Sequence, residues 1–336
     1  DAAPFLQRVY HEAVMRIVLL LATGLFVAVG VYAETPPPFE RQWGTPGQVG
    51  GGPGQFWTPG GMATDAAGNV YVVELDNHRV QKFTPNGAFL QMWGSFGTAN
   101  GQFGSPRGIA IDPSSGAIYV ADSGNHRLQK FSAAGAHLLT WGTRGAANGQ
   151  FDNPQDVGVD ASGTVYVADT ANHRVQAFNG DGSFVRAWGT LGTGAGQMSS
   201  PTGLTVNGSG EILVTQFGSS RVQVFTTTGT LVREWGTNGS GQDQLKTPWG
   251  IAVDGQDNVY VVDRGNHRIQ KFSAVGTWLT GWGSMGTATG EFWWPIGITV
   301  DSHGSVFVSD TFYRIQKFGT PVPVRNTTWG RIKAGS

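Results

Sequence analysis

Apolar and polar residues follow one another in an order that recurs along most of the chain. A stretch close to Pro-x-Gly-apolar-x-apolar-Asp returns every 47 or 48 residues. Its copies begin at Pro59, Pro106, Pro154, Pro201, Pro248 and Pro295. A constant period of roughly 20 to 50 residues is typical of proteins built from stacked structural repeats. The pattern therefore predicts six copies of one supersecondary unit.

Each copy contains four short segments with the apolar character of β-strands. In the second copy they are residues 108–112, 117–122, 126–131 and 137–142. Asp and Gly residues separate the first two segments, as at Asp65 and Gly68, where Asp bonds its own backbone and Gly accepts a positive φ. Four short antiparallel strands per unit match one propeller blade. We predict an all-β fold, a six-bladed β-propeller of four-stranded antiparallel blades.

A second motif recurs between the second and third segments. Asp-x-x-Asn-His-Arg-(Val/Ile/Leu)-Gln-x-Phe is complete at 122–131, 169–178 and 263–272, and nearly complete at 74–83. This motif resembles the signature of the NHL-repeat family, and the resemblance implies six-bladed propellers. The fourth copy departs from it at 215–221, and the sixth is one residue short at 310–314.

Six blades need six outer strands, but seven Trp-Gly pairs are candidates to end them. They lie at Trp43, Trp93, Trp141, Trp188, Trp235, Trp282 and Trp329. Residues 39–44 lead into the first blade through a connector that resembles those between blades. The C-terminal candidate, 324–330, follows Pro321 and Pro323, which fit poorly near a paired strand. We expect the N-terminal segment to close the ring as an outer strand.

The N-terminus carries the main indication of compartment. Arg16 precedes an apolar run from Ile17 to Val31, and small residues end at Ala33, as in a secretory signal. An uncleaved anchor is the alternative, which would attach the protein to a membrane. We predict an N-terminal extension and signal peptide or anchor at 1–33, a Pro-rich linker at 34–38, the propeller at 39–319 and a tail at 320–336. The expected location is extracytoplasmic, periplasmic or secreted, and we expect a monomer.

Composition excludes several kinds of function. The chain has a formal net charge of −1 with interspersed charges, so no basic surface for nucleic acid is expected. It contains no Cys, so it has neither a disulfide framework nor a thiolate nucleophile. We predict no cofactor.

Residues that recur at one phase in most blades are interpreted as structural. We expect His78, His126, His173 and His267 to be hydrogen-bonded between blades, rather than to form a metal site. The Asp that ends the second strand and the Arg that starts the third are predicted to pair and tie blade to blade. The Trp of each Trp-Gly pair is predicted to pack between blades.

A ligand site should instead use positions where the blades differ. Such positions surround one mouth of the central channel, at the start of the first strand and between the second and third. The candidates are Arg107, Gln155, Asp156, Thr202, Gln216, Phe217, Trp249, Arg264, Phe312 and Tyr313, with Trp293 and Trp294 on the same rim. Aromatic walls with a few polar groups are typical of ligand sites. An ordinary variable, solvated surface is the alternative interpretation.

Two functions follow from these candidates. The first is a rigid recognition module for a peptide, glycan or partner protein, with Arg107 and Arg264 gripping an anion. The second is a metal-dependent lyase or hydrolase that uses zinc or calcium. The chain resembles the peptidyl-hydroxyglycine amidating lyases, and the resemblance implies zinc-binding histidines after the Pro of the inner strands. None of the six matching residues here is His. We predict neither catalytic nor metal-binding residues.

Overall fold

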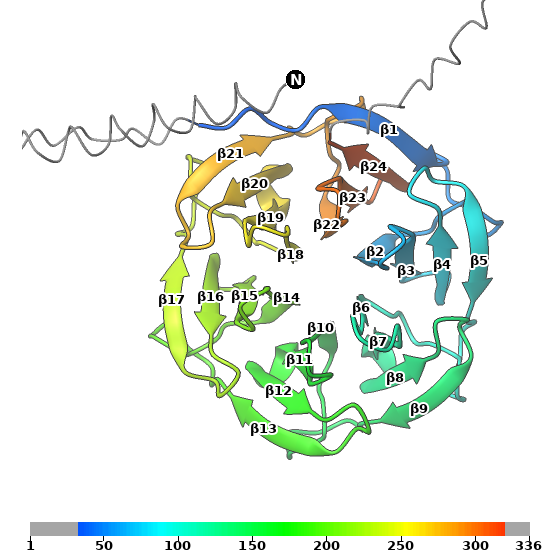
Figure 1. Ribbon diagram of the computed structural model, residues 1–336, viewed down its shortest axis with the longest axis vertical. Helices are drawn as coiled ribbons and strands as arrows, with labels where there is room; N and C mark the ends of the chain where they lie inside the picture. The colour runs from blue at the N-terminus through cyan, green and yellow to red at the C-terminus, as the bar shows by residue number, and fades with distance from the viewer. Residues whose placement is uncertain (1–32, 320–336) are drawn as a thin grey trace, which may run out of the picture. The chain divides into compact units, whose positions relative to one another are not determined.

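The computed structural model describes residues 33–319, which fold into six antiparallel four-stranded sheets arranged in a ring (Figure 1). The predicted fold class is confirmed. The signal or anchor, the C-terminal tail and the alternative closing segment 324–330 fall in residues 1–32 and 320–336, outside the described residues. Within residues 33–319, no helix is long and apolar enough to cross a membrane.

The strands of each blade run from the channel outward in chain order, except in the sixth. Blade one contains β2 (Pro59–Thr64), β3 (Val70–Glu74), β4 (Arg79–Phe83) and β5 (Phe89–Trp93), and blade two β6 (Gly108–Ile111), β7 (Ile118–Asp122), β8 (Arg127–Phe131) and β9 (His137–Trp141). Blade three contains β10 (Pro154–Val159), β11 (Val165–Asp169), β12 (Arg174–Phe178) and β13 (Phe184–Trp188), and blade four β14 (Pro201–Val206), β15 (Ile212–Gln216), β16 (Arg221–Phe225) and β17 (Leu231–Trp235). Blade five contains β18 (Ile251–Val253), β19 (Val259–Asp263), β20 (Arg268–Phe272) and β21 (Trp278–Trp282), and blade six β22 (Pro295–Val300), β23 (Val306–Asp310), β24 (Arg314–Phe318) and β1 (Phe39–Gly44). Three 3-10 turns follow second strands, η1 (Ser123–Asn125), η2 (Thr170–Asn172) and η3 (Arg264–Asn266).

The core lies between neighbouring blades. All five residues of each second strand are buried, whereas the outer strands are partly exposed. Trp93 at the end of β5 lies 6.3 Å from Tyr71 of its own blade and 6.1 Å from Phe131 of the next, measured between ring centroids. Aromatic pairs at this separation bury large areas and stabilise the contact. The predicted packing role is confirmed for the six Trp-Gly tryptophans in residues 33–319, whereas Trp329 lies outside them.

The N-terminal strand closes the ring, as predicted. β1 pairs with β24, with Phe39 opposite Phe318 and Gly44 opposite Arg314. Its Trp43 ring lies 6.0 Å from Phe83 of blade one and 6.0 Å from Phe307 of blade six. The first and last repeats are therefore joined by the same kind of outer tryptophan contact that Trp93 makes between blades one and two.

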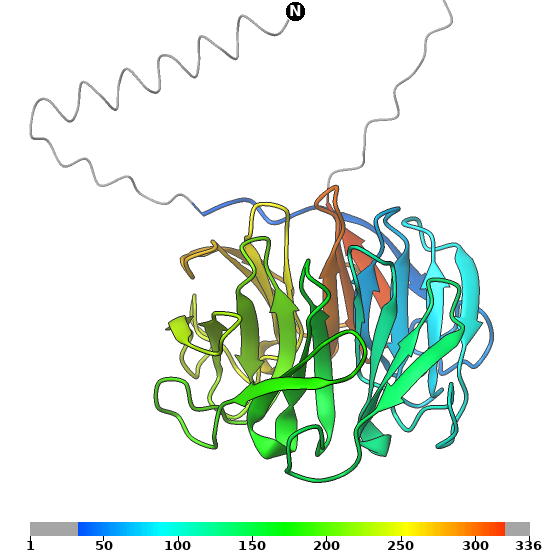
Figure 2. The ribbon, with the colours of Figure 1, turned by 60° about the horizontal axis from the view of Figure 1, so that its bottom comes forward.

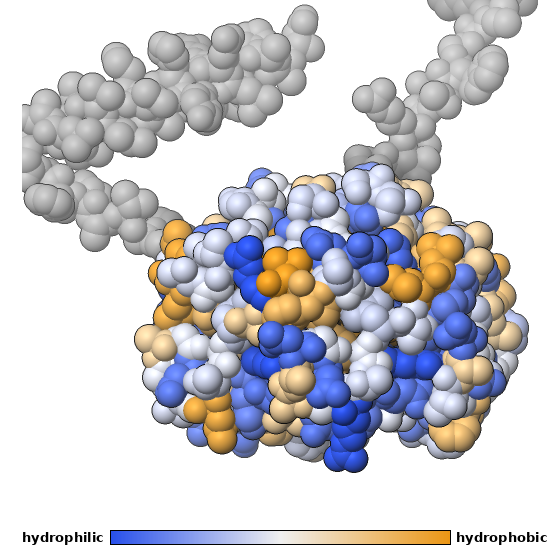
Figure 3. Space-filling view, turned by 90° about the horizontal axis from the view of Figure 1, so that it is seen from below, coloured by the Kyte–Doolittle hydropathy of each residue, from blue (hydrophilic) through white to orange (hydrophobic). Residues whose placement is uncertain are grey.

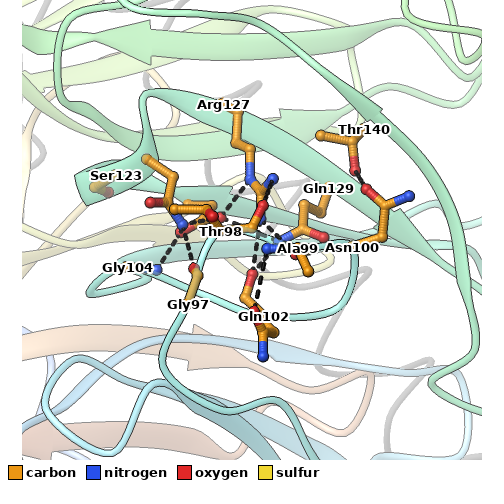
Figure 4. Close-up of polar contacts among 12 residues, drawn as sticks. Gly97, Thr98, Ala99, Asn100, Gln102, Gly104, Ser123, Arg127, Gln129 and Thr140 are labelled. Carbon is orange, nitrogen blue, oxygen red and sulfur yellow. Dashed lines mark hydrogen bonds and ion pairs between the residues drawn. The ribbon is translucent and has the colours of Figure 1, made fainter.

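The predicted Asp–Arg pair forms within a blade and ties it to the connector from the preceding blade. Antiparallel register places Asp122 opposite Arg127 in β7 and β8, and Arg127 Nε lies 2.7 Å from Asp122 Oδ2. Asp122 Oδ1 also accepts a hydrogen bond from the Gly104 N–H of the connector at 2.6 Å, and the rest of the contact is made by the Arg127 guanidinium. It donates to main-chain carbonyls of Thr98, Ala99 and Gln102, in the connector that arrives from blade one (Figure 4).

The repeated histidines are hydrogen-bonded between blades, as predicted. His126 lies just before β8 with φ of 53°, and its Nδ1 accepts a hydrogen bond from the Asn153 N–H before blade three. His78, His173 and His267 make the same contact with the next blade. These imidazoles are therefore part of the fold.

The outer wall of the ring has a mixed surface. Figure 2 shows the strands running between the two faces of the ring. In the side view of Figure 3, small hydrophobic groups are separated by hydrophilic ones. Exposed apolar residues of the wall include Leu138 in β9 and Val185 in β13. Apolar side chains scattered singly in this way are normal on a protein surface and do not mark a binding site.

Candidate functional site

The six inner strands enclose a channel with a cavity of about 300 Å³. Five of the predicted site residues line it, namely Arg107, Gln155, Asp156, Thr202 and Trp249. Each comes from the start of an inner strand, the position at which the repeats differ most. The structure thus brings half of the predicted set to one concave site, the form that small-ligand sites usually take.

Arg107 and Trp249 meet at the mouth although they belong to blades two and five, which face each other across the ring. The Cζ atom of Arg107 lies 5.9 Å from the centroid of the Trp249 ring. The arginine side chain therefore reaches across the opening, where a cation next to an indole ring is stabilised by the ring quadrupole.

Arg264 completes a cluster around Trp249. Its Cζ atom lies 5.0 Å from the centroid of Trp249 and 5.1 Å from that of Trp294. Phe217 contacts the Trp249 ring edge-to-face at 5.8 Å. We call Arg107, Phe217, Trp249, Arg264 and Trp294 the mouth cluster. Four of them were predicted site residues, and Trp294 was predicted to lie on the same rim.

Within the described residues, the two guanidinium groups of the mouth cluster form no ion pair with an acidic side chain. Among residues 33–319, neither Arg107 nor Arg264 has a side-chain hydrogen bond or ion pair, and Arg264 Nε is buried without a partner. Burial lowers the pKa of both arginines, and the charge of Arg107 lowers that of Arg264 further. Asp76 acts in the opposite direction and raises the pKa of Arg107. Arginine stays protonated under such shifts, so the mouth holds two cations available to an anion.

Two further polar side chains lie on the channel wall, both from the start of β10 in blade three. Gln155 is 5% exposed, and its Oε1 is buried without a hydrogen-bond partner in the described part of the chain. Asp156 accepts hydrogen bonds from its neighbour Val157 N–H at 2.9 Å and from Leu204 N–H of blade four at 2.9 Å. Burial raises the pKa of Asp156 to about 7. Asp156 therefore links inner strands β10 and β14 at the channel.

The stability of the propeller should depend on the ionisation of Asp156. An unfolded Asp has a pKa of about 3.9, so the folded chain binds more protons between about pH 4 and the folded pKa of about 7. The free energy of unfolding should then fall by roughly 2–4 kcal/mol as the pH rises through this window. Urea unfolding at about pH 5 and about pH 8 should show a smaller fall for Asp156→Asn than for wild type. An equal fall in both proteins would contradict this role.

Gln216 does not reach the mouth, which corrects the prediction for this residue. It is fully buried at the end of β15, opposite Arg221, where other blades have the paired Asp. Its Oε1 accepts from Ser219 Oγ at 2.7 Å and from Arg221 Nε at 3.3 Å. The missing negative charge comes from Glu234 instead, whose Oε2 lies 3.1 Å from Arg221 Nη1. Gln216 is thus the last residue of β15, whereas the prediction placed it in the link between the second and third strands.

Tyr313 is also placed differently from the prediction. With φ of 62° it occupies the position before the third strand that His fills in other blades, and it packs against the core cluster between blades six and one. Phe312 lies 5.4 Å from Arg314 Cζ, over the ion pair of blade six. Thr202 lines the channel, but its Oγ1 donates to the Pro248 carbonyl at 3.0 Å. These three side chains serve contacts within the ring.

Residues 33–319 contain no group of three or more His, Asp or Glu side chains that could hold a metal ion.

The repeats and the ring identify the class of protein. The model of the NHL repeat matches residues 56–83, 103–131, 151–178, 198–225 and 245–272, which lie in blades one to five. The chain is therefore a β-propeller that carries NHL repeats in blades one to five. Protein brain tumor of Drosophila melanogaster is 34% identical to it over 70 residues, which are 21% of this chain and 7% of that protein.

Solved structures share the fold. A gluconolactonase from Xanthomonas campestris has a TM-score of 0.61 at 17% identity, with 85% of this chain and 96% of that chain covered. Virginiamycin B lyase from Staphylococcus aureus with quinupristin has a TM-score of 0.56 at 14% identity, covering 78% and 80%. A nidogen/laminin complex has a TM-score of 0.54 at 20% identity, covering 72% and 84%. At these identities the likeness concerns the fold alone.

Proposed function

We propose that this NHL propeller is an exported, monomeric recognition module that binds a peptide, glycan or partner protein at the channel mouth. One observation carries the proposal: Arg107 and Arg264 share the Trp249 ring and have no acidic partner in residues 33–319. Unpaired guanidiniums beside aromatic walls suit a carboxylate carried on an apolar or ring-shaped group. NHL propellers commonly bind proteins, which supports a binding role.

Charge and packing at the mouth should both contribute to binding. We expect Arg107→Ala and Trp249→Ala each to weaken binding of carboxylate ligands by about tenfold or more, because central Arg and Trp residues dominate such interfaces. The measurement is calorimetry with short peptides that have free or amidated C-termini, and with uronate or neutral oligosaccharides. Arg144→Ala is the matched control, since the Arg144 side chain is 73% exposed and lies 3.8 Å from Asp152.

Two outcomes would contradict the recognition module. Retention of wild-type affinity by both variants, for every probe that binds, would remove the mouth cluster from the site. Stoichiometric zinc or calcium in the purified protein would instead support a metal-dependent lyase or hydrolase.

Export is tested separately. N-terminal sequencing of protein recovered outside the cytoplasm should show a chain that begins at Glu34, after cleavage behind Ala33. A full-length chain recovered with membranes would indicate the anchored form.

A further inference from the structure

We infer that the channel mouth selects a dianionic group borne on a planar ring, either a phosphomonoester or two adjacent carboxylates, over a monoanion. This inference rests on the proposed function and names the ligand chemistry of the same site. Its basis is the balance of charges at the mouth cluster and the aromatic surface around it.

The charges that face the mouth add up to a positive surplus. Arg107 and Arg264 act on each other as like charges, and Lys246 and Arg264 both act on His267. Burial lowers the pKa of His267, so this imidazole is neutral near pH 7. The nearby carboxylate is Asp76, which acts on Arg107 and whose Oδ2 accepts a hydrogen bond from Thr58 Oγ1 at 2.5 Å. Arg107, Arg264 and Lys246 therefore place three positive charges in this region against the one negative charge of Asp76, so a monoanion would leave one positive charge uncompensated.

Desolvation makes that remaining charge costly. Both arginines are partly buried, and burial is the largest cause of their lowered pKa. The repulsion between two charges grows as water is excluded from around them. A ligand with two negative charges pairs with both guanidiniums and removes their repulsion, whereas a single charge removes only part of it.

The aromatic residues indicate the carrier of the charge. Trp294 is 39% exposed and Phe217 is 37% exposed, so both offer uncovered ring surface beside the arginines. Gln155 adds an unpartnered, buried Oε1 on the channel wall, an acceptor for an N–H or O–H of the ligand. A planar ring stacks on aromatic side chains at little conformational cost, which places its anionic groups at the two arginines.

Three probes with one phenyl ring test the inference: benzoate, phthalate and phenyl phosphate. At about pH 8 benzoate is a monoanion, phthalate is a dianion, and phenyl phosphate is a dianion because its second pKa is about 6. Calorimetry with the full-length protein at low salt measures each affinity. We expect at least one dianion to bind about tenfold tighter than benzoate, the gain expected from one more charge-assisted contact.

Variants of Arg264 test whether its positive charge causes the preference for a dianion. Arg264→Gln should reduce the preference for the dianion to within about threefold of benzoate, while Arg264→Lys, which keeps the charge, should retain most of it. Arg144→Gln on the exposed surface should change neither affinity. Circular dichroism of each variant checks that the fold is intact.

The outcomes distinguish the inference from the proposed function. If benzoate binds as tightly as both dianions and binding is lost in Arg107→Ala, the recognition site stands and the dianion preference is wrong. If none of the three probes binds, or if binding is unchanged in both arginine variants, the inference and the anion site both fail. Tighter binding of phthalate alone supports paired carboxylates, and tighter binding of phenyl phosphate alone supports a phosphomonoester.

Discussion

Arg314→Ala is expected to lower the free energy of unfolding by about 3–5 kcal/mol, the usual effect of removing one partner of a buried ion pair. Arg314 is 0% exposed and its Nε lies 3.1 Å from Asp310 Oδ2. The guanidinium also donates to the carbonyls of Thr287 and Glu291 and to Gln42 Oε1 of the closing strand. The substitution leaves the buried Asp310 carboxylate without its cationic partner and removes a hydrogen-bond donor from each of the two carbonyls.

The pH dependence of this effect gives a second readout. Burial raises the pKa of Asp310 to about 6 even with Arg314 present. The arginine stabilises only the ionised carboxylate, so the loss should be larger at about pH 8 than at about pH 5. Urea unfolding of wild type, Arg314→Ala and Arg144→Ala at both pH values measures it. A loss no larger than that of the exposed Arg144 would show that the buried pair contributes little.

Removal of residues 34–44 is expected to cost at least about 5 kcal/mol and to abolish cooperative unfolding. The deletion removes β1, leaves β24 as an open sheet edge, and takes Trp43 from the contact between blades six and one. Loss of a packed Trp alone costs about 3–5 kcal/mol, and folded domains have only about 5–15 kcal/mol to lose. Thermal unfolding followed by circular dichroism, with light scattering for aggregation at the open edge, measures the effect.

A circular permutant provides the matched control. In blade two, a five-residue turn joins Phe131 of β8 to His137 of β9. Phe318 and Phe39 are opposite each other in blade six, as Phe131 and His137 are in blade two. A chain that starts after residue 44 and carries residues 39–44 behind Phe318 through a copy of that turn should recover cooperative unfolding. Failure of the permutant to fold would mean that the N-terminal connection, and not only the strand, is required.

Repetition explains why the fold was predictable from the sequence. Each blade packs against its neighbours in the same way, so the residues that make these contacts, such as Trp93, His126 and Arg127, recur at constant spacing. Spacing along the chain also predicted the Asp–Arg pair, although it does not tell which carbonyls the guanidinium reaches. One detail still failed. Gln216 was assigned to the mouth, because its blade replaces Asp by an amide and obscures the register.

The sequence predicted most of the residues of the mouth cluster, but not which of them contact one another. Variation among repeats selected Arg107, Gln155, Trp249 and Arg264, since a site in a ring of similar blades needs residues that differ. Nothing in the sequence indicates that Arg107 reaches Trp249 on the facing blade, or that Arg264 lies between two indole rings. Those contacts depend on side-chain direction at the ends of strands, which no repeat pattern encodes.

The sequence by itself determined the number of blades, the strands in each and the segment that closes the ring, because local periodicity and hydrophobic burial act in the same way in every repeat. Only the tertiary structure decided which charges remain without partners. A guanidinium that bonds connector carbonyls, as in Arg127, becomes part of the fold, whereas Arg107 and Arg264 lie beside the Trp249 ring and act on each other as like charges. That difference arises from closure of the ring, which brings distant repeats together around one channel.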